Sequence, residues 1–186
     1  MTPFPRHTHV APSNVSELLL RDVASLVLTT ELISSSLVAL RPECEFSNEL
    51  TAIINSMINL CDEGESRLQQ PRLEAGIVLP TTTDSSASTL ITGFFTRLPS
   101  ARDPKVFASE LVLNLRLLAQ HVELKARLAA EEAAIVGLEG IGDALDDWSV
   151  AWRDCGRKIG GLSFRDRSRS ALTQASGLNF AIPQGI

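Results

Sequence analysis

Leu145-Asp146-Asp147-Trp148-Ser149-Val150-Ala151-Trp152-Arg153 has the pattern of a helix that starts on acidic residues and continues along an apolar face. Two carboxylates in a first helical turn stabilise the helix dipole by ~0.3 to 1 kcal/mol. The pattern predicts a helix that begins near residues 143 to 146. It should end before Gly160-Gly161, because glycine often follows the last turn of a helix.

Three more helices are predicted upstream of this one. Asn14-Val-Ser-Glu17 is a capping box that starts the first helix, and Arg41-Pro42 ends it. Ser47 is expected to cap the second helix, which Pro71 should stop. Asp103-Pro104 starts the third, as an N-cap followed by proline at the first helical position. The fold class is therefore predicted to be all-α, as an antiparallel four-helix bundle.

Two segments between the helices have a different character. Ile77-Val-Leu79 and Leu90-Ile-Thr-Gly-Phe-Phe-Thr96 are rich in β-branched and aromatic residues and flank a polar loop. They predict a small β-ribbon at one end of the bundle. Residues 129 to 142 are rich in alanine, glutamate and glycine, and few of them are apolar enough to hold a packed structure. We expect this stretch to be an exposed, mobile connection.

Composition limits the classes of protein to be considered. With 186 residues, 44% hydrophobic and 21% charged, the chain suits one domain with one sizeable core. Its net charge of -5 argues against binding nucleic acid by overall charge, although local contacts are not excluded. Three widely spaced cysteines fit neither a disulfide framework nor a metal pair, so a reducing compartment is expected. No signal peptide is expected, because the N-terminus is polar and broken by prolines. No membrane span is expected, because charged and polar residues interrupt the apolar runs.

Catalytic signatures are not found in the sequence. His121 stands apart from His7 and His9, and no Glu-x-x-His pair exists for a di-metal site in a bundle. A glycine-rich phosphate loop of the P-loop type is not found either. The prediction is that the protein is not an enzyme and acts by binding.

Several strings, taken in order, carry a family resemblance. Leu145–Arg153 is followed by Arg169-Ser-Ala-Leu-Thr-Gln-Ala-Ser-Gly-Leu-Asn-Phe180, and upstream lie Phe95-Thr-Arg-Leu-Pro99, Lys105-Val-Phe107 and Val112-Leu113. In order and spacing these strings resemble coat proteins of rod-shaped plant RNA viruses, of the tobacco mosaic virus-like (virgavirus or benyvirus) type. The resemblance runs in pieces from about Phe95 to Phe180.

The resemblance implies an architecture, a function and partners. Residues 1–12 would form an N-terminal arm, and residues 13–164 the four-helix bundle, with an inner-radius loop near 129–142. Residues 165–186 would be a C-terminal segment on the outer surface. The protein would be a capsid subunit that assembles with itself into a helical rod around single-stranded viral RNA. It would be found in the virion and the host cytoplasm, with no membrane partner.

The same resemblance implies RNA contacts on the last helix. Asp147 would accept a hydrogen bond from a ribose hydroxyl, with Asp146 beside it. Arg153 would be held in a buried ion pair with Glu123 or Asp154. The residues that would lie near the bases are Ser149, Val150 and Ala151.

On the third helix the resemblance places a phosphate-binding arginine at Arg127, and Lys125 is a weaker candidate. Glu132, with Glu131 and Glu139 as alternatives, would oppose a carboxylate of the neighbouring subunit. Such a pair raises a pKa and would bind divalent cations weakly; no other cofactor is implied. The chain departs from the family at Ala129, where a second arginine would be expected.

Each of these residues also has an explanation without RNA. Acids at a helix start stabilise the dipole, and charged side chains near a helix end keep it soluble. The alternative function is therefore a cellular helical-bundle adaptor or scaffold protein that does not bind RNA.

Overall fold

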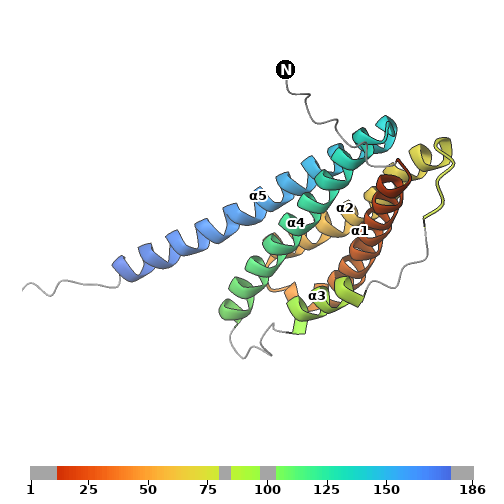
Figure 1. Ribbon diagram of the computed structural model, residues 1–186. Coiled ribbons are helices and arrows are strands. Elements are labelled where there is room, and N and C mark those ends of the chain that lie inside the picture. Colours follow the sequence, from red (N-terminus) through yellow and green to blue (C-terminus); the bar gives the residue numbers. More distant parts are fainter. Residues whose placement is uncertain (1–11, 80–84, 97–103, 177–186) are drawn as a thin grey trace, which may run out of the picture.

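The computed structural model describes residues 12–79, 85–96 and 104–176 (Figure 1). The elements are α1 (Pro12–Leu40), the 3-10 helix η1 (Arg41–Cys44), α2 (Asn48–Glu74), α3 (Ser85–Thr96), α4 (Pro104–Ile135) and α5 (Glu139–Ser176). No strand occurs within these three ranges. The prediction of an all-α fold is confirmed.

The four long helices pack in a ring around one core. α1 contacts α2 and α4, and α5 contacts the same two helices, so each long helix has two long neighbours. α2 and α4 run in one direction and α1 and α5 in the other, so the neighbours in the ring are antiparallel (Figure 1). The short helix α3 packs on α1. The closest pairing is between α4 and α5.

Two tryptophans fill the part of the core that lies against α5. Trp148 and Trp152 are both fully buried. The indole Nε1 of Trp148 donates a 2.9 Å hydrogen bond to the backbone oxygen of Leu60 on α2. Gly64, one turn further along α2, lies against the same indole ring, where a Cβ atom would collide with it. The α2–α5 contact thus depends on a glycine that leaves room for an aromatic ring.

The predicted β-ribbon is wrong. Residues 85–96 form α3, and residues 77–79 have no regular structure. Ile91, Phe94 and Phe95 are spaced as one face of a helix, and Ile91 is buried in the core. Asn114 of α4 donates a 3.2 Å hydrogen bond from Nδ2 to the oxygen of Phe94. Burial of this face therefore outweighs the strand preference of the β-branched residues.

Residues 129–142 are not the exposed connection that composition suggested. α4 continues to Ile135, α5 begins at Glu139, and three residues join them. Gly137 adopts a left-handed conformation with φ 77°, and the amide of Leu138 donates to the oxygen of Ala133, as in a Schellman turn. Alanine has the highest helix propensity, which explains why the alanine-rich part extends α4 instead of forming a loop.

Helix ends differ from the predictions where glycine and proline were expected to act as stops. α5 runs through Gly160-Gly161 to Ser176. Each glycine destabilises the helix by about 1 kcal/mol relative to alanine, and burial of the neighbouring Ile159 in the core outweighs this cost. α2 continues past Pro71 for about one turn. The N-cap at Ser47 is confirmed, since its side chain accepts from the amide of Leu50. The predicted arm, apart from Pro12, and residues 177–186 lie outside the described residues.

α1 is the most apolar of the long helices. By length and composition the segment Glu17–Cys44 would be able to cross a membrane, with a window of mean hydropathy 1.8. More than half of that window, 56%, is buried within the protein. This degree of burial is typical of a core helix in a bundle.

Candidate functional site

The α4–α5 hairpin sets which residues of the two helices lie side by side. The helices are antiparallel and joined by three residues, so positions equally distant from the turn lie at the same level. Arg127 on α4 and Asp147 on α5 are therefore at one level along the hairpin. Glu123 and Arg153 lie further from the turn, and the ion pair between them fixes this register.

α5 presents several of the predicted RNA-binding residues to solvent. Asp146 and Asp147 are exposed, Val150 is 41% exposed and Ala151 is half-buried. Asp146, Val150 and Arg153 follow one another at helical spacing, so they lie on one face of α5. This face is accessible to a ligand in the described structure.

Ser149 does not share this exposure. Its side chain is fully buried, and its Oγ donates a 2.8 Å hydrogen bond to the backbone oxygen of Asp146. The structure therefore places Ser149 inside the helix packing and away from any surface that a base would contact. Trp148 and Trp152, on either side of it, are buried as well.

Arg153 joins α5 to α4 through an ion pair. Its Nε donates to Glu123 Oε1 at 3.1 Å. Of the two partners considered from the sequence, Glu123 is the one in contact, because Asp154 accepts from Arg157 instead. The Arg153 side chain is 37% exposed, so the pair lies at the surface of the bundle and is not buried as expected.

The two cationic candidates of α4 have different surroundings. Arg127 is exposed. Lys125 is half-buried, and its Nζ donates a 3.0 Å hydrogen bond to Ser25 Oγ on α1. Arg127 is thus free to reach a ligand in solvent, whereas Lys125 is turned toward α1 and contributes to the α1–α4 contact.

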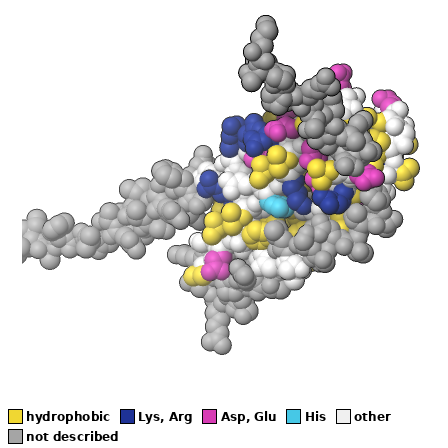
Figure 2. Space-filling model, in the orientation of Figure 1, with side chains coloured by type: hydrophobic (Ala, Val, Ile, Leu, Met, Phe, Trp, Pro, Cys, Tyr) yellow, Lys and Arg dark blue, Asp and Glu magenta, His cyan; other side chains and the backbone are white. Residues whose placement is uncertain are grey.

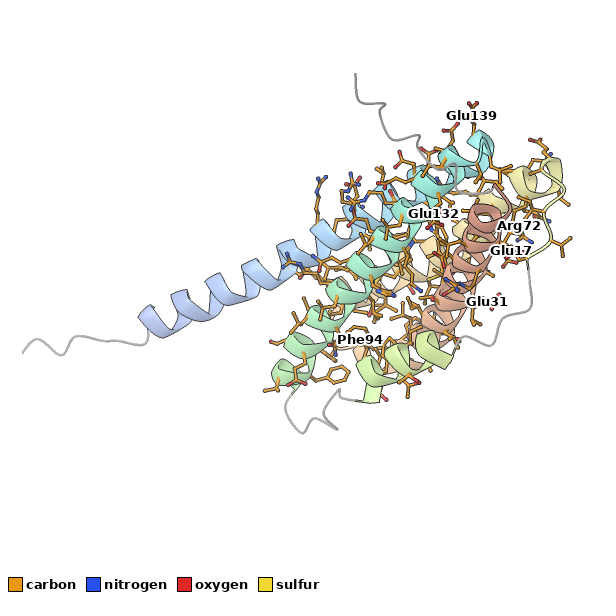
Figure 3. All side chains as sticks on the ribbon, in the orientation of Figure 1. Glu17, Glu31, Arg72, Phe94, Glu132 and Glu139 are labelled. Atoms are coloured by element: carbon orange, nitrogen blue, oxygen red, sulfur yellow. The ribbon has the colours of Figure 1, made fainter. Side chains whose placement is uncertain are left out.

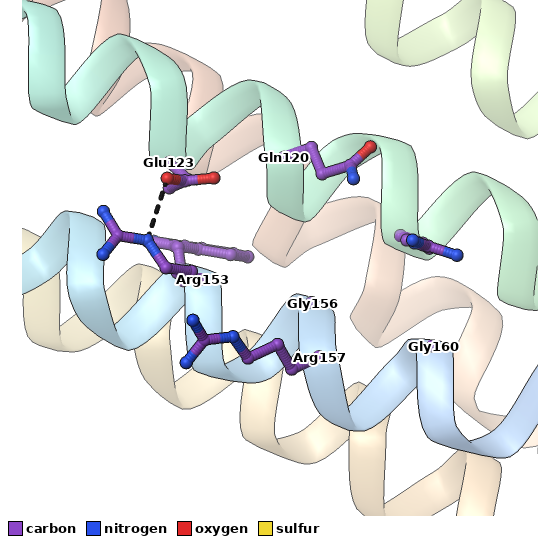
Figure 4. Close-up of a pocket in the computed structure, with 8 residues that line it drawn as sticks. Gln120, Glu123, Arg153, Gly156, Arg157 and Gly160 are labelled. Atoms are coloured by element: carbon purple, nitrogen blue, oxygen red, sulfur yellow. Dashed lines mark hydrogen bonds and ion pairs between the residues drawn. The ribbon is translucent and has the colours of Figure 1, made fainter.

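A groove between α4 and α5 joins the Arg153–Glu123 pair to residues that sequence reasoning did not single out (Figure 4). We call it the α4–α5 groove. Gln120 and Glu123 line it from α4, opposite Arg153 and Arg157 of α5 (Figure 4). The lining residues are spaced by one and two helical turns on each helix, and this spacing was the only sign of the groove in the sequence. It identifies the groove only when the register of the hairpin is known, because the register decides which residues of α4 and α5 face each other. The remaining lining residues are Arg116, Trp152, Gly156 and Gly160.

The two candidate inter-subunit carboxylates differ in environment. Glu131 is exposed. Glu132 lies on the side of α4 that faces α1 (Figure 3), and its Oε2 is buried without a hydrogen-bond partner among the described residues. Burial raises the pKa of Glu132, the nearby Asp22 raises it further, and Arg21 opposes the shift. The anionic form of Glu132 is therefore disfavoured in the folded chain.

We expect Glu132→Gln to stabilise the protein at neutral pH and to have little effect in acid. A carboxyl group whose pKa is higher in the folded state than in the unfolded state binds its proton more tightly when folded. The contribution of this carboxyl group to the free energy of unfolding is complete below its pKa in the unfolded state. That contribution is lost as the pH rises through its pKa in the folded state. Urea unfolding of both proteins across this range measures the difference; Glu131→Gln, at an exposed position, is the matched control.

An exposed apolar stripe runs along α4. It consists of six large side chains that are between 42% and 74% exposed. Val106, Leu117 and Leu128 follow one another at intervals of eleven residues, and the other three members have the same spacing. Eleven residues are close to three helical turns, so all six lie on one face. Figure 2 shows hydrophobic side chains gathered on this face around the histidine in view. The stripe consists of Val106, Leu113, Leu117, Leu124, Leu128 and Ile135.

Reactive groups are not assembled within the described residues. No group of three histidine, cysteine, aspartate or glutamate side chains is positioned to hold a metal ion there. His121 has its pKa lowered by burial and by Lys125. Burial raises the pKa of the Cys44 and Cys155 thiols to about 11, so neither is a ready nucleophile at neutral pH. The described surface offers binding features, among them the α4–α5 groove and the apolar stripe.

Comparison with known proteins gives no match to a family model, to a curated protein or to a solved structure.

Proposed function

We propose that this protein is a structural capsid subunit that assembles into a helical rod and encloses single-stranded RNA. The proposal starts from the resemblance of Leu145–Arg153 and its neighbouring strings to coat proteins of rod-shaped plant RNA viruses. A ring of four long antiparallel helices is the kind of subunit that this resemblance implies. Arg153 and Glu123 are in contact, as the resemblance implies for the last helix, although the pair lies at the surface of the bundle and is not buried.

The apolar stripe on α4 is the observation that carries the self-assembly part of the proposal. Soluble monomers rarely leave such a long row of large hydrophobic side chains uncovered, and exposed patches of this kind mark interaction surfaces. At roughly 100 Å² for each side chain, the stripe and an equal area of a second copy would bury about 1,200 Å², the lower end of the range for specific interfaces. A second copy of this chain is the occupant we propose.

The RNA-binding part rests on the solvent-facing residues of the α4–α5 hairpin. Arg127 would neutralise a phosphate, Asp147 with Asp146 would accept from a ribose hydroxyl, and Val150 and Ala151 would offer apolar surface to bases. Apolar surface accepts any base, whereas hydrogen bonds to base edges would select a sequence. Each copy would neutralise few phosphates, so binding would be weak, salt-dependent and reinforced by contacts between neighbouring copies.

Electron microscopy of the purified chain with and without single-stranded RNA tests the proposal. We expect discs, stacked rings or rods, and rods that protect RNA from nuclease. Arg127→Ala should reduce RNA protection at moderate salt and leave discs intact, whereas Arg67→Ala on α2, an exposed arginine away from the hairpin, should not. A chain that stays monomeric over a wide range of pH, salt and concentration would favour the adaptor or scaffold function instead.

A further inference from the structure

The α4–α5 groove is rich in positive charge although the chain as a whole is acidic. Three guanidinium groups line it, those of Arg116, Arg153 and Arg157, against one carboxylate, that of Glu123. The net charge of the full sequence is -5. A local excess of cations on an acidic protein attracts anions to that place and not to the surface in general.

Much of the hydrogen-bonding capacity of these arginines is unused. Glu123 accepts only from Nε of Arg153, which leaves both terminal nitrogens of that side chain without a partner among the described residues. Asp154 accepts from Nη1 of Arg157 alone. Arginine presents a planar set of donors that matches the oxygen atoms of a phosphate group. The groove therefore contains donors arranged on two facing helices and available to a ligand.

Arg116 is an exposed residue that lines the groove from α4 and lies against a glycine of α5. Its guanidinium lies over Gly160, with Cζ only 3.7 Å from the place where a Cβ atom would be. No ion pair of Arg116 occurs within the described residues. Gly156 and Gly160 lie one helical turn apart on the α5 side of the groove. The side chains of α4 lie against both glycines, Ala119 against Gly156 and Arg116 against Gly160.

A buried donor completes the lining. Trp152 is fully buried, and its indole Nε1 has no hydrogen-bond partner within the described residues. Buried polar groups are nearly always hydrogen-bonded, so this donor is one that water or a bound acceptor would satisfy. Gln120 adds a neutral amide from α4.

We propose that the α4–α5 groove binds a phosphate group, held by Arg116, Arg153 and Arg157 beside the buried indole of Trp152. A phosphate carries several acceptor oxygens and negative charge, which suits donors converging from two helices. If the group belongs to the RNA backbone, this site rests on the proposed function and adds a phosphate contact to that of Arg127. A free phosphate ion or a nucleotide has the same chemistry and would occupy the same place.

Tryptophan fluorescence of the full-length protein tests the site. The chain has two tryptophans, and Trp152 lines the groove whereas Trp148 packs against Gly64. Inorganic phosphate and a short oligouridylate are titrated separately at low ionic strength, first alone and then in competition. Arg116→Gln removes one cation from the groove, and Arg67→Gln is the matched control on α2.

Both ligands should change the fluorescence of the wild type and of Arg67→Gln, and Arg116→Gln should raise the apparent Kd about tenfold, as expected for loss of a charge-assisted hydrogen bond.

Competition between the two ligands identifies the RNA backbone as the source of the phosphate, and binding of phosphate alone identifies a free anion. The inference is overturned if phosphate leaves the fluorescence unchanged or if Arg116→Gln binds it as tightly as Arg67→Gln. Rod formation is scored separately: phosphate binding without rods refutes the capsid proposal alone, and rods without phosphate binding refute the groove alone.

Discussion

Gly64→Ala should destabilise the protein by about 3 kcal/mol, a typical cost for overpacking a core, and lower its Tm by on the order of 10 °C. The added Cβ would overlap the indole ring of Trp148, and that ring has no free volume to move into because it is fully buried. Its position is also fixed by the hydrogen bond from Nε1 to the oxygen of Leu60. Urea and thermal unfolding followed by circular dichroism measure the loss.

The control is Gly161→Ala on α5. That glycine is helical and exposed, and nothing lies within 4 Å of its Cβ position. Alanine should stabilise the protein there by about 0.5 to 1 kcal/mol, since glycine is the poorer helix former. Changes of opposite sign in the free energy of unfolding at these two helical glycines would show that the space beside Trp148 is required for stability. Equal stabilisation at both positions would mean that α2 and α5 do not approach each other in this way.

The double substitution Leu117→Gln and Leu124→Gln should abolish self-association and leave a folded monomer. Both residues lie in the middle of the exposed stripe on α4 and are 42% and 45% exposed. Loss of about 2 kcal/mol of apolar burial at each leucine weakens a contact between copies by roughly a thousandfold. Sedimentation velocity over a range of concentrations measures the association, and circular dichroism verifies the fold.

Leu73→Gln with Val78→Gln is the matched control for the stripe. These residues are 68% and 84% exposed, more than either leucine, but they lie at and after the end of α2. Association should be unchanged in this variant. If both double variants assemble like the wild type, the stripe is not the interface. If both fail to assemble, overall hydrophobicity and not the α4 face is responsible.

The sequence predicted the helices well where local signals agree with packing. Ser47 caps α2 as expected, and α1 ends just before Arg41-Pro42. The failures occur where a tertiary contact outweighs a local preference. The segment that forms α3 is rich in β-branched residues, but it is helical because this places Ile91 in the core. α5 continues past two glycines because Ile159, next to them, is packed in the core. These outcomes depend on partners distant in sequence, which composition does not reveal.

The candidate site was only partly predictable for a related reason. The pairing of Arg153 with Glu123 or Asp154 was expected, but the choice between the two required the register of the hairpin. Arg116 and Gly160 lie more than forty residues apart, and neither belongs to a recognisable motif. Ser149 follows two acidic residues in a promising string, but the helix phase buries it.

The short turn at Gly137 also has a consequence for how the chain folds. α4 and α5 are joined by three residues, so their contacts beside the turn are local in sequence and can form with little loss of loop entropy. The contacts further from the turn can then form in succession along the two helices. α1 and α2 form a second local unit through η1. We expect two helical hairpins to form rapidly and independently, and the slower step to be their docking, in which Trp148 closes over Gly64.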